Sequence, residues 1–196
     1  MISTIASAIV VFVSTNIDDT LVLLLLFSLT ENKSKELFVV IGQYIGFSFL
    51  IGISLTGYFA DAFLSKELIG LMGIAPILLG AAKAYNLINN KNGTQEIKYE
   101  NKKTKYINPV ILNTSIITIA NGGDNIGVYV PLFASFTIEQ LITTLLVFFI
   151  LTGVWCFAGY KLVKLKKIAV VITHYGDRVV PFILIGLGIS IILKAF

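Results

Sequence analysis

Three aspartates lie within stretches of the sequence that are otherwise apolar. Asp18 and Asp19 are adjacent in one stretch, and Asp124 lies in another. A charged side chain at the centre of a bilayer costs about 2.5–3.5 kcal/mol on insertion scales, so an acidic group there is expected to have a function. Because neighbouring helical residues point about 100° apart, one regular helix cannot direct Asp18 and Asp19 at the same point. The sequence therefore predicts either an unwound helix at this pair or a second carboxylate that serves a neighbouring helix.

Amide and hydroxyl side chains accompany these carboxylates. Thr15 and Asn16 precede Asp18, and two asparagines flank Asp124. Oxygen ligands with a net negative charge select a cation, most naturally a divalent one. An anion or an amino acid would instead call for basic groups or for half-helix N-termini directed at its carboxylate. No lysine or arginine lies in the middle of an apolar stretch, which disfavours anions. The predicted metal ligands are Asp18, Asp19, Asp124 and Asn125, and the predicted additional ligands or path residues are Asn16, Thr15, Asn121 and Gln43.

The segment around Asp124 also predicts an interrupted helix. It reads Asn121-Gly122-Gly123-Asp124-Asn125-Ile126-Gly127, and Pro131 follows it. Each glycine weakens a helix by about 1 kcal/mol relative to alanine, and a proline removes a backbone donor. A broken helix in a membrane frees backbone carbonyls that can face a ligand. The residues predicted to break the helix are Gly122, Gly123, Gly127 and Pro131, with helix packing as a second role for Gly127.

The stretches that hold these residues have the length and composition of membrane spans. Of the 196 residues, 56% are hydrophobic and 13% are charged, against about 25% charged residues in soluble domains. Six apolar stretches are near the ~20 residues that cross a bilayer. They cover residues 4–29, 37–60, 68–88, 108–134, 138–160 and 179–195. Residues 161–178 predict a separate short amphipathic helix at the membrane surface.

Basic residues are concentrated in loops on one side of the predicted spans. Most of the 15 lysines and arginines follow the first, third and fifth stretches, so the positive-inside rule puts the 89–107 loop in the cytoplasm and both termini outside. These lysines form no face alongside aromatic residues, so we expect no nucleic-acid partner. The single histidine, His174, excludes an all-histidine site. The single cysteine, Cys156, is expected to pack among apolar side chains, and whether it contacts an ion is left open.

The two halves of the sequence resemble each other. When Asp18 is laid on Asp124, Asp19 falls on Asn125. Three spans in each half is an odd number, so the halves enter the membrane from opposite sides, as in many secondary transporters. The alternative is chance similarity between apolar helices. The predicted fold is an all-α membrane protein with six transmembrane helices in two inverted three-helix repeats. Its parts are the first repeat at 1–88, a cytoplasmic linker at 89–107 and the second repeat at 108–196.

Four sequence motifs extend over nearly the whole chain and occur in the same order as in a known family. They lie at residues 16–19, 42–46, 71–80 and 121–131. Together they resemble the cadmium-resistance transporters of the CadD type, which belong to the lysine-exporter superfamily. The resemblance implies a multi-pass protein of a bacterial plasma membrane that exports cadmium. By position, the acidic residues of that family correspond to Asp18, Asp19 and Asp124, and its amide corresponds to Asn125. Magnesium, manganese, calcium or zinc would fit oxygen ligands as well as cadmium does.

The residues and the resemblance predict a secondary transporter that exports a divalent cation in exchange for protons. Burial and mutual repulsion favour the protonated form of carboxylates, and the sequence lacks the G-x-x-x-x-G-K-S/T nucleotide-binding motif. We expect no enzyme activity and no cofactor. The expected partners are the cation and the lipid bilayer, and a homodimer is left open. The alternatives are an exporter of Mn, Mg or Zn, an amino-acid exporter, a passive channel, and an intramembrane aspartyl protease, although Asn121 departs from the protease motif Gly-x-Gly-Asp.

Overall fold

A computed structural model describes the backbone of residues 2–17, 19–30, 32–60, 68, 71–89, 108–163 and 166–195. The side chains at 21, 60, 166–177, 179 and 194–195 are not described. Within these ranges the regular structure is helical, and no strand occurs. The helices are α1 (Ile2–Asn16), α2 (Asp19–Ser28), α3 (Lys33–Ala60), α5 (Ile74–Ile88), α6 (Pro109–Asn121), α7 (Gly123–Ala134), α8 (Ile138–Leu162) and α9 (Lys166–Ala195).

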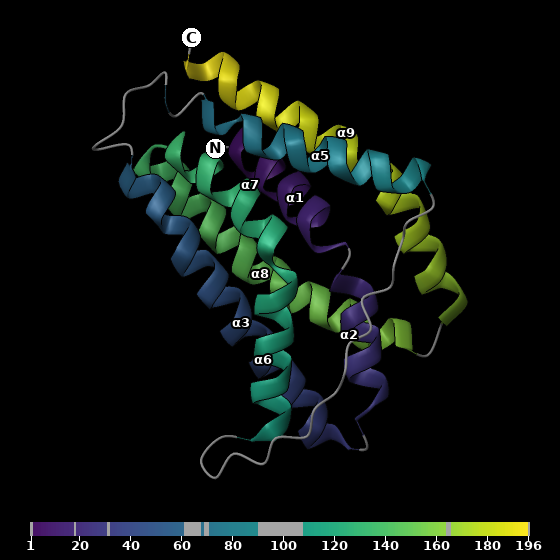
Figure 1. Ribbon diagram of the computed structural model, residues 1–196. Coiled ribbons are helices and arrows are strands. Elements are labelled where there is room, and N and C mark those ends of the chain that lie inside the picture. Colours follow the sequence, from purple (N-terminus) through teal and green to yellow (C-terminus); the bar gives the residue numbers. More distant parts are fainter. Residues whose placement is uncertain are drawn as a thin grey trace.

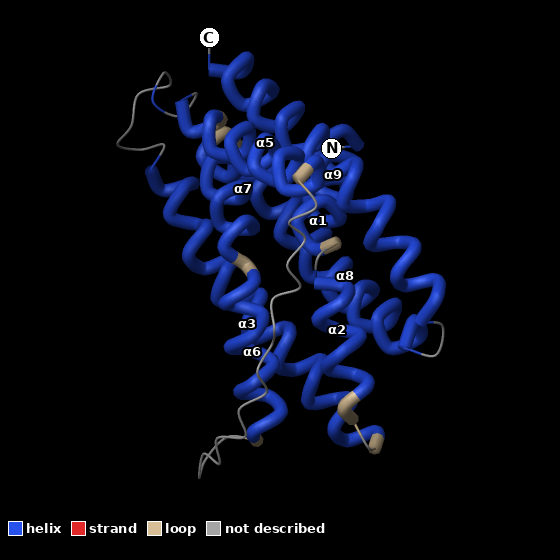
Figure 2. The backbone as a smooth tube through the Cα atoms, turned by 45° about the vertical axis from the view of Figure 1, so that its right-hand side comes forward, coloured by secondary structure: helices blue, strands red, loops and turns tan. Residues whose placement is uncertain are grey.

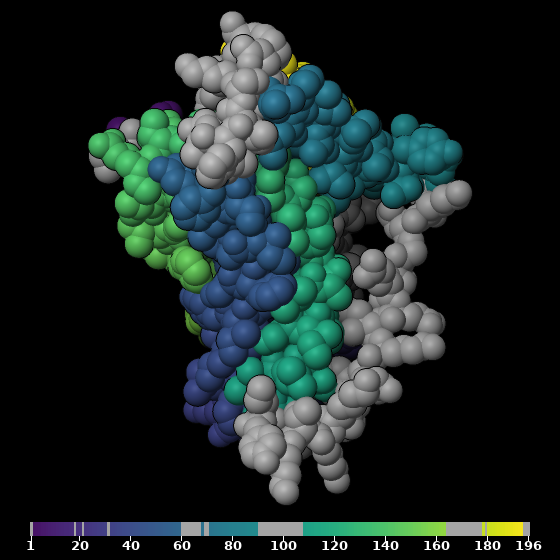
Figure 3. All heavy atoms as spheres, turned by 60° about the vertical axis from the view of Figure 1, so that its left-hand side comes forward, coloured from purple at the N-terminus to yellow at the C-terminus, as the bar shows by residue number. Residues whose placement is uncertain are grey.

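The helices pack as an elongated bundle. α3 lies along both α6 and α7, α8 lies along both α1 and α2, and α5 packs mainly against α9 (Figure 1). Figure 3 views the face on which α3, in blue, runs beside α6 and α7, in teal to green. Both chain ends and the turn from α7 to α8 lie at one end of the bundle, whereas the turn from α2 to α3 and the start of α6 lie at the other end in both backbone views.

Two of the predicted spans are each divided into two helices. The 4–29 stretch forms α1 and α2, and the 108–134 stretch forms α6 and α7. α6 begins in the usual way, since Asn108 accepts a hydrogen bond from the backbone of Val110 and Pro109 occupies the first helical turn. At the other end of α6, Gly122 separates it from α7 and makes no side-chain cap.

The predicted boundary near residue 178 is wrong. The 161–178 segment was expected to be a separate surface helix, but α9 runs without interruption from Lys166 to Ala195 and includes Pro181. A proline inside a helix bends it without necessarily ending it, and Figure 1 shows α9 bent along its length. Charge patterning located the change in polarity, but a change in polarity does not require a change in backbone conformation. Residues 90–107, most of the predicted linker, lie outside the described residues.

Among the residues that the structure describes, two helices are long and apolar enough to cross a membrane, Lys33–Phe59 and Ile138–Leu162. Shorter apolar helices cover Ile2–Asn16, Ile74–Ile88, Pro109–Asn121 and Val180–Leu193. α8 is apolar around its whole circumference: its outward residues Leu146 and Ile150 are 61% and 66% exposed, while Phe148 faces the interior and is fully buried. A helix that is hydrophobic on all sides and still exposes such residues is typical of a membrane span.

Aromatic side chains fill the centre, where α1, α3, α7 and α8 meet. The ring of Phe148 lies 5.6 Å from Phe12, 6.2 Å from Phe47 and 4.8 Å from Tyr129, measured between ring centroids. α3 approaches α6 and α7 closely because it presents glycine there: a Cβ added to Gly57 would lie only 2.0 Å from the Val130 carbonyl oxygen. This close packing fixes α7 relative to α3 and therefore holds the polar residues described next.

Candidate functional site

The two interruptions lie at a similar level, between the two ends of the bundle. Figure 2 shows them as short tan segments, one between α1 and α2 and the other between α6 and α7. Asp19 lies in the first turn of α2, and Asp124 lies in the first turn of α7. Helix N-termini stabilise carboxylates through the helix dipole, and the C-terminal ends of α1 and α6 leave backbone carbonyls without helical partners. The region therefore combines carboxylates with backbone oxygen atoms.

Asp19 joins the two interruptions. Its side chain is only 5% exposed, and its Oδ1 accepts a hydrogen bond from Nδ2 of Asn121, the last residue of α6. A buried carboxylate requires such donors because its transfer from water is otherwise very unfavourable. The predicted site residues Asp19 and Asn121 are therefore in direct contact, although they come from opposite halves of the chain.

A second link joins the end of α1 to α7 through Tyr129, which the sequence analysis missed. The phenol oxygen of this tyrosine lies 2.7 Å from Oγ1 of Thr15 and accepts a hydrogen bond from Nδ2 of Asn16 at 3.1 Å. All three side chains are buried. A sequence signal did exist, because Tyr129 follows Asn125 by four residues and so shares its helix face, and a buried tyrosine hydroxyl usually requires a partner.

Asp124 forms an ion pair with Lys83 of α5. The distance from Lys83 Nζ to Asp124 Oδ2 is 3.0 Å, and the two side chains are 24% and 18% exposed, respectively. Oδ1 of Asp124 accepts a hydrogen bond from the backbone N–H of Asn125 at 2.9 Å. The lack of a basic residue in the middle of a span disfavours an anion or an amino acid, but Lys83, near the end of the 68–88 stretch, still reaches Asp124. The available signal was a lysine within an apolar helix, since such a residue generally pairs with another charge or reaches the interface.

Asn125 and Gln43 occupy different surroundings. Asn125 is 1% exposed, and its Oδ1 has no hydrogen-bond partner among the described residues. Oγ1 of Thr20, next to Asp19, is likewise buried without a partner in that part of the chain. Gln43, in contrast, accepts a hydrogen bond from Thr118 at 2.7 Å and thereby contributes to the contact between α3 and α6. Asn125 thus offers an unused buried oxygen, whereas Gln43 Oε1 already has a donor.

The four residues predicted to break the helix of the 108–134 stretch differ in how they relate to the observed interruption. α6 ends before Gly122, and the space beside the exposed Gly123 is open, since an added Cβ would meet no atom within 4 Å. Gly127 packs against α5, because a Cβ added there would lie 2.7 Å from Cδ1 of Leu79. Pro131 lies inside α7, which continues to Ala134. The interruption is therefore confined to Gly122, and neither Gly127 nor Pro131 interrupts α7.

Asp18 is a predicted ligand, whereas contact between Cys156 and an ion is a question that the sequence leaves open. Asp18 lies outside the described residues. Cys156 is buried in an apolar cluster with Leu23, Leu26 and Phe27. Within the described ranges, no group of three or more histidine, cysteine, aspartate or glutamate residues is arranged to hold a metal ion. The described acidic groups at the interruptions are thus Asp19 and Asp124.

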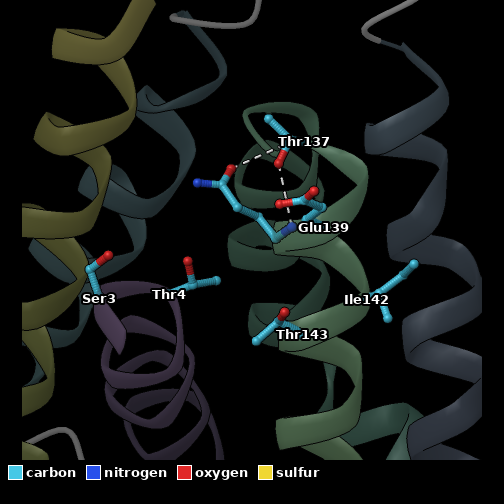
Figure 4. A pocket seen from close by; sticks show the side chains of 7 residues that line it. Ser3, Thr4, Thr137, Glu139, Ile142 and Thr143 are labelled. Atoms are coloured by element: carbon cyan, nitrogen blue, oxygen red, sulfur yellow. Dashed lines mark hydrogen bonds between the residues drawn. The ribbon is translucent and has the colours of Figure 1, made fainter. Parts of the chain in front are cut away.

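A separate cavity of about 520 Å³ lies where the N-terminal ends of α1 and α8 approach each other. Figure 4 shows the residues that line it, with Thr137 and Gln140 joined in the capping box that begins α8. None of its lining residues belongs to the two interruptions. Its lining residues are Ser3, Thr4, Thr137, Glu139, Gln140, Ile142 and Thr143.

Comparison with known proteins identifies the family. A family model described as "cadmium resistance transporter" matches residues 12–195, nearly the whole chain. No curated protein and no solved structure matches. A metal-efflux family and two helices suited to crossing a bilayer together indicate a membrane transporter, and the family is one of transporters. The chain belongs to the cadmium resistance transporter family.

Proposed function

We propose that this protein is a secondary transporter that exports a divalent metal cation, with cadmium as the first candidate, across a bacterial plasma membrane in exchange for protons. One observation carries the proposal: two interrupted helices meet through the hydrogen bond between Asn121 and Asp19. This meeting brings together the first turn of α2 and the last turn of α6, next to Asp124 at the start of α7.

The chemistry of the region favours a cation. Asp19 and Asp124 supply carboxylates, and the buried Oδ1 of Asn125 supplies a neutral oxygen. Hard divalent cations are bound by such oxygen atoms, often with backbone carbonyls. The proposed ligands are Asp18, Asp19, Asp124 and Asn125, with Thr15, Asn16 and Asn121 supporting them. Lys83 and the N-termini of α2 and α7 are features that an amino-acid exporter would also require, so amino acids belong among the compounds to be tested.

Six membrane crossings in two inverted repeats would explain how such a site reaches both sides of the membrane. The helices correspond in pairs, because α1–α2 and α6–α7 are both interrupted, α3 and α8 are both long, and α5 pairs with α9. The packing is also reciprocal: α3 lies on α6 and α7, while α8 lies on α1 and α2. Rocking of the two repeats about the fixed interruptions would open the site to each side in turn.

The choice of ion rests on the family more than on the ligands. Cadmium prefers sulfur, but Cys156 is surrounded by apolar side chains of α2 and α3. Oxygen ligands would bind cadmium less tightly, which suits a transporter that must release its cargo. Manganese, magnesium and zinc are therefore the alternatives to compare with cadmium.

Proton exchange is the coupling that carboxylate ligands would allow. Once the cation has left, protons would neutralise the negative charge that remains on these ligands. The returning transporter would then carry protons in the opposite direction. In sealed vesicles, an imposed proton gradient should drive cation accumulation, and a protonophore should abolish it. Accumulation that persists with the protonophore would contradict proton coupling.

The cation site is tested by Asp124→Asn, which keeps the shape of the side chain but removes its charge. We expect the initial rate of cadmium transport in proteoliposomes to fall by about tenfold or more, because a charged ligand contributes several kcal/mol at the short distances of a site. Glu36→Gln is the matched control, since Glu36 lies in the first turn of α3, away from the interruptions. Equal rates in Asp124→Asn and wild type would exclude this carboxylate as a ligand.

A further inference from the structure

The pairing of Lys83 with Asp124 gives the site a cation of its own. The ammonium nitrogen lies 3.0 Å from Oδ2 of Asp124. Divalent cations bind carboxylate oxygens at about 2.0–2.6 Å. Two positive charges so close to one carboxylate repel each other. Lys83 and a metal ion bound by Asp124 would therefore compete for this carboxylate.

The position of Lys83 in the fold makes this exchange mechanically feasible. Lys83 belongs to α5, which packs chiefly on α9, whereas Asp124 begins α7, which packs chiefly on α3. The contact between α5 and α7 is smaller and includes the fit of Leu79 against Gly127. The side chain of Lys83 is 24% exposed, so neighbouring atoms leave part of it accessible. A long flexible side chain that is partly exposed can leave Asp124 and return to it.

We propose that Lys83 is a tethered counter-ion that competes with the transported cation for Asp124. The inference rests on the proposed function, because it assumes that Asp124 binds the cargo. An arriving cation displaces the ammonium group, and the ammonium group replaces the cation as it departs. Lys83 therefore weakens equilibrium binding but keeps Asp124 neutralised between transport steps.

This role separates binding from transport. Removing the competing charge tightens cation binding, because the cargo no longer has to displace an ammonium group. The same change slows turnover, because the cation leaves a tighter site more slowly and Asp124 then loses the positive charge of Lys83. A lysine that merely held α5 against α7 would have another effect: its loss would loosen the site and weaken binding and transport together.

The test uses Lys83→Met in the full-length protein, with cadmium and manganese chlorides as probes. Lys83→Met keeps the length of the side chain and should lower the dissociation constant by about tenfold at constant pH, while the maximal transport rate falls. Lys161→Met is the matched control: Lys161 lies over the ring of Phe157 on α8, with 5.4 Å between its Nζ and the ring centroid, so its loss should change neither quantity. Lys83→Arg retains the charge and should keep binding near that of wild type. Unchanged or weaker binding in Lys83→Met would overturn the proposal.

A second measurement needs no variant and therefore does not depend on the folding of a mutant. Amine acetylation of the wild-type protein, read by mass spectrometry, should be faster at Lys83 in the presence of cadmium, relative to Lys161. Equal labelling ratios with and without cadmium would also overturn the proposal, provided that cadmium binds. If the wild-type protein binds none of the divalent cations, the proposed function itself fails; if it binds them and Lys83 is unaffected, only this inference fails.

Discussion

At the scale of single residues, polar groups at the interruptions pair between the two halves of the chain. Asn121 donates to Asp19, Tyr129 contacts Thr15, and Lys83 contacts Asp124. Each of these contacts joins one residue before the 89–107 segment to one after it. Pairing of this type keeps buried polar groups satisfied. It also means that relative motion of the two halves must rearrange the same groups that would bind the cargo.

The sequence located the carboxylates and amides but neither Lys83 nor Tyr129. Acidic residues in apolar spans are unusual enough to be recognised without a structure, because lipid makes them costly. A tyrosine in a span is common and reads as an apolar residue. Lys83 lies close to a polar loop in sequence, and only the packing of α5 beside α7 directs its end toward Asp124.

Removal of one hydroxyl at Tyr129 tests whether its link to α1 matters for transport. Tyr129→Phe should lower the free energy of unfolding by about 1 kcal/mol, the typical net value of a hydrogen bond, and should also reduce the transport rate. The control is Tyr44→Phe, which removes a hydrogen bond to the carbonyl of Phe149 between α3 and α8. We expect a similar loss of stability there with normal transport. Equal transport in both variants would assign Tyr129 to stability alone.

At the scale of helices, the second interruption was predicted and the first was one of two alternatives, and the two arise from different chemistry. Glycine explains the second, because α6 and α7 are separated at Gly122. The first contains no glycine or proline: Asn16 turns its amide back to the carbonyl of Phe12, and Thr15 likewise bonds Val11. Side chains that bond the preceding turn compete with the backbone and weaken helices. The continuity of α9 could not be predicted from polarity, because backbone hydrogen bonds bridge a change from polar to apolar residues.

The close packing of α3 can be tested by the same substitution, glycine to alanine, at two positions of this helix. A Cβ at Gly57 would meet the backbone carbonyl of Val130 at 2.0 Å, whereas a Cβ at Gly52 would meet nothing within 4 Å. Gly57→Ala should therefore lower the free energy of unfolding by about 1–3 kcal/mol, and Gly52→Ala should leave it unchanged or raise it by up to about 1 kcal/mol. Thermal unfolding followed by the fluorescence of the single tryptophan, Trp155, measures both. Equal melting temperatures would mean that α3 and α7 are not held at this distance.

At the scale of the whole molecule, the contacts between halves suggest why the chain would work as one unit. α3 of the first half packs on α6 and α7 of the second, and α8 of the second half packs on α1 and α2 of the first. Neither half therefore encloses its own interrupted helix. If the halves are inverted repeats, each interrupted helix is held by the opposite repeat, and rocking changes both sides of the site together.

The proposed orientation can be tested by the accessibility of introduced cysteines. Both termini lie at one end of the bundle (Figure 1). Because the loops rich in lysine are expected in the cytoplasm, that end is expected to face the outside of the cell. In a Cys156→Ala background, which removes the single native cysteine, Ser3→Cys should react with a membrane-impermeant thiol reagent in intact cells. Asn32→Cys lies in the exposed turn between α2 and α3 at the opposite end, so it should react only after the membrane is opened. Reaction of Asn32→Cys in intact cells with protection of Ser3→Cys would reverse the orientation. Equal reaction of both in intact cells would put them on the same side of the membrane and would contradict a single crossing between Ser3 and Asn32.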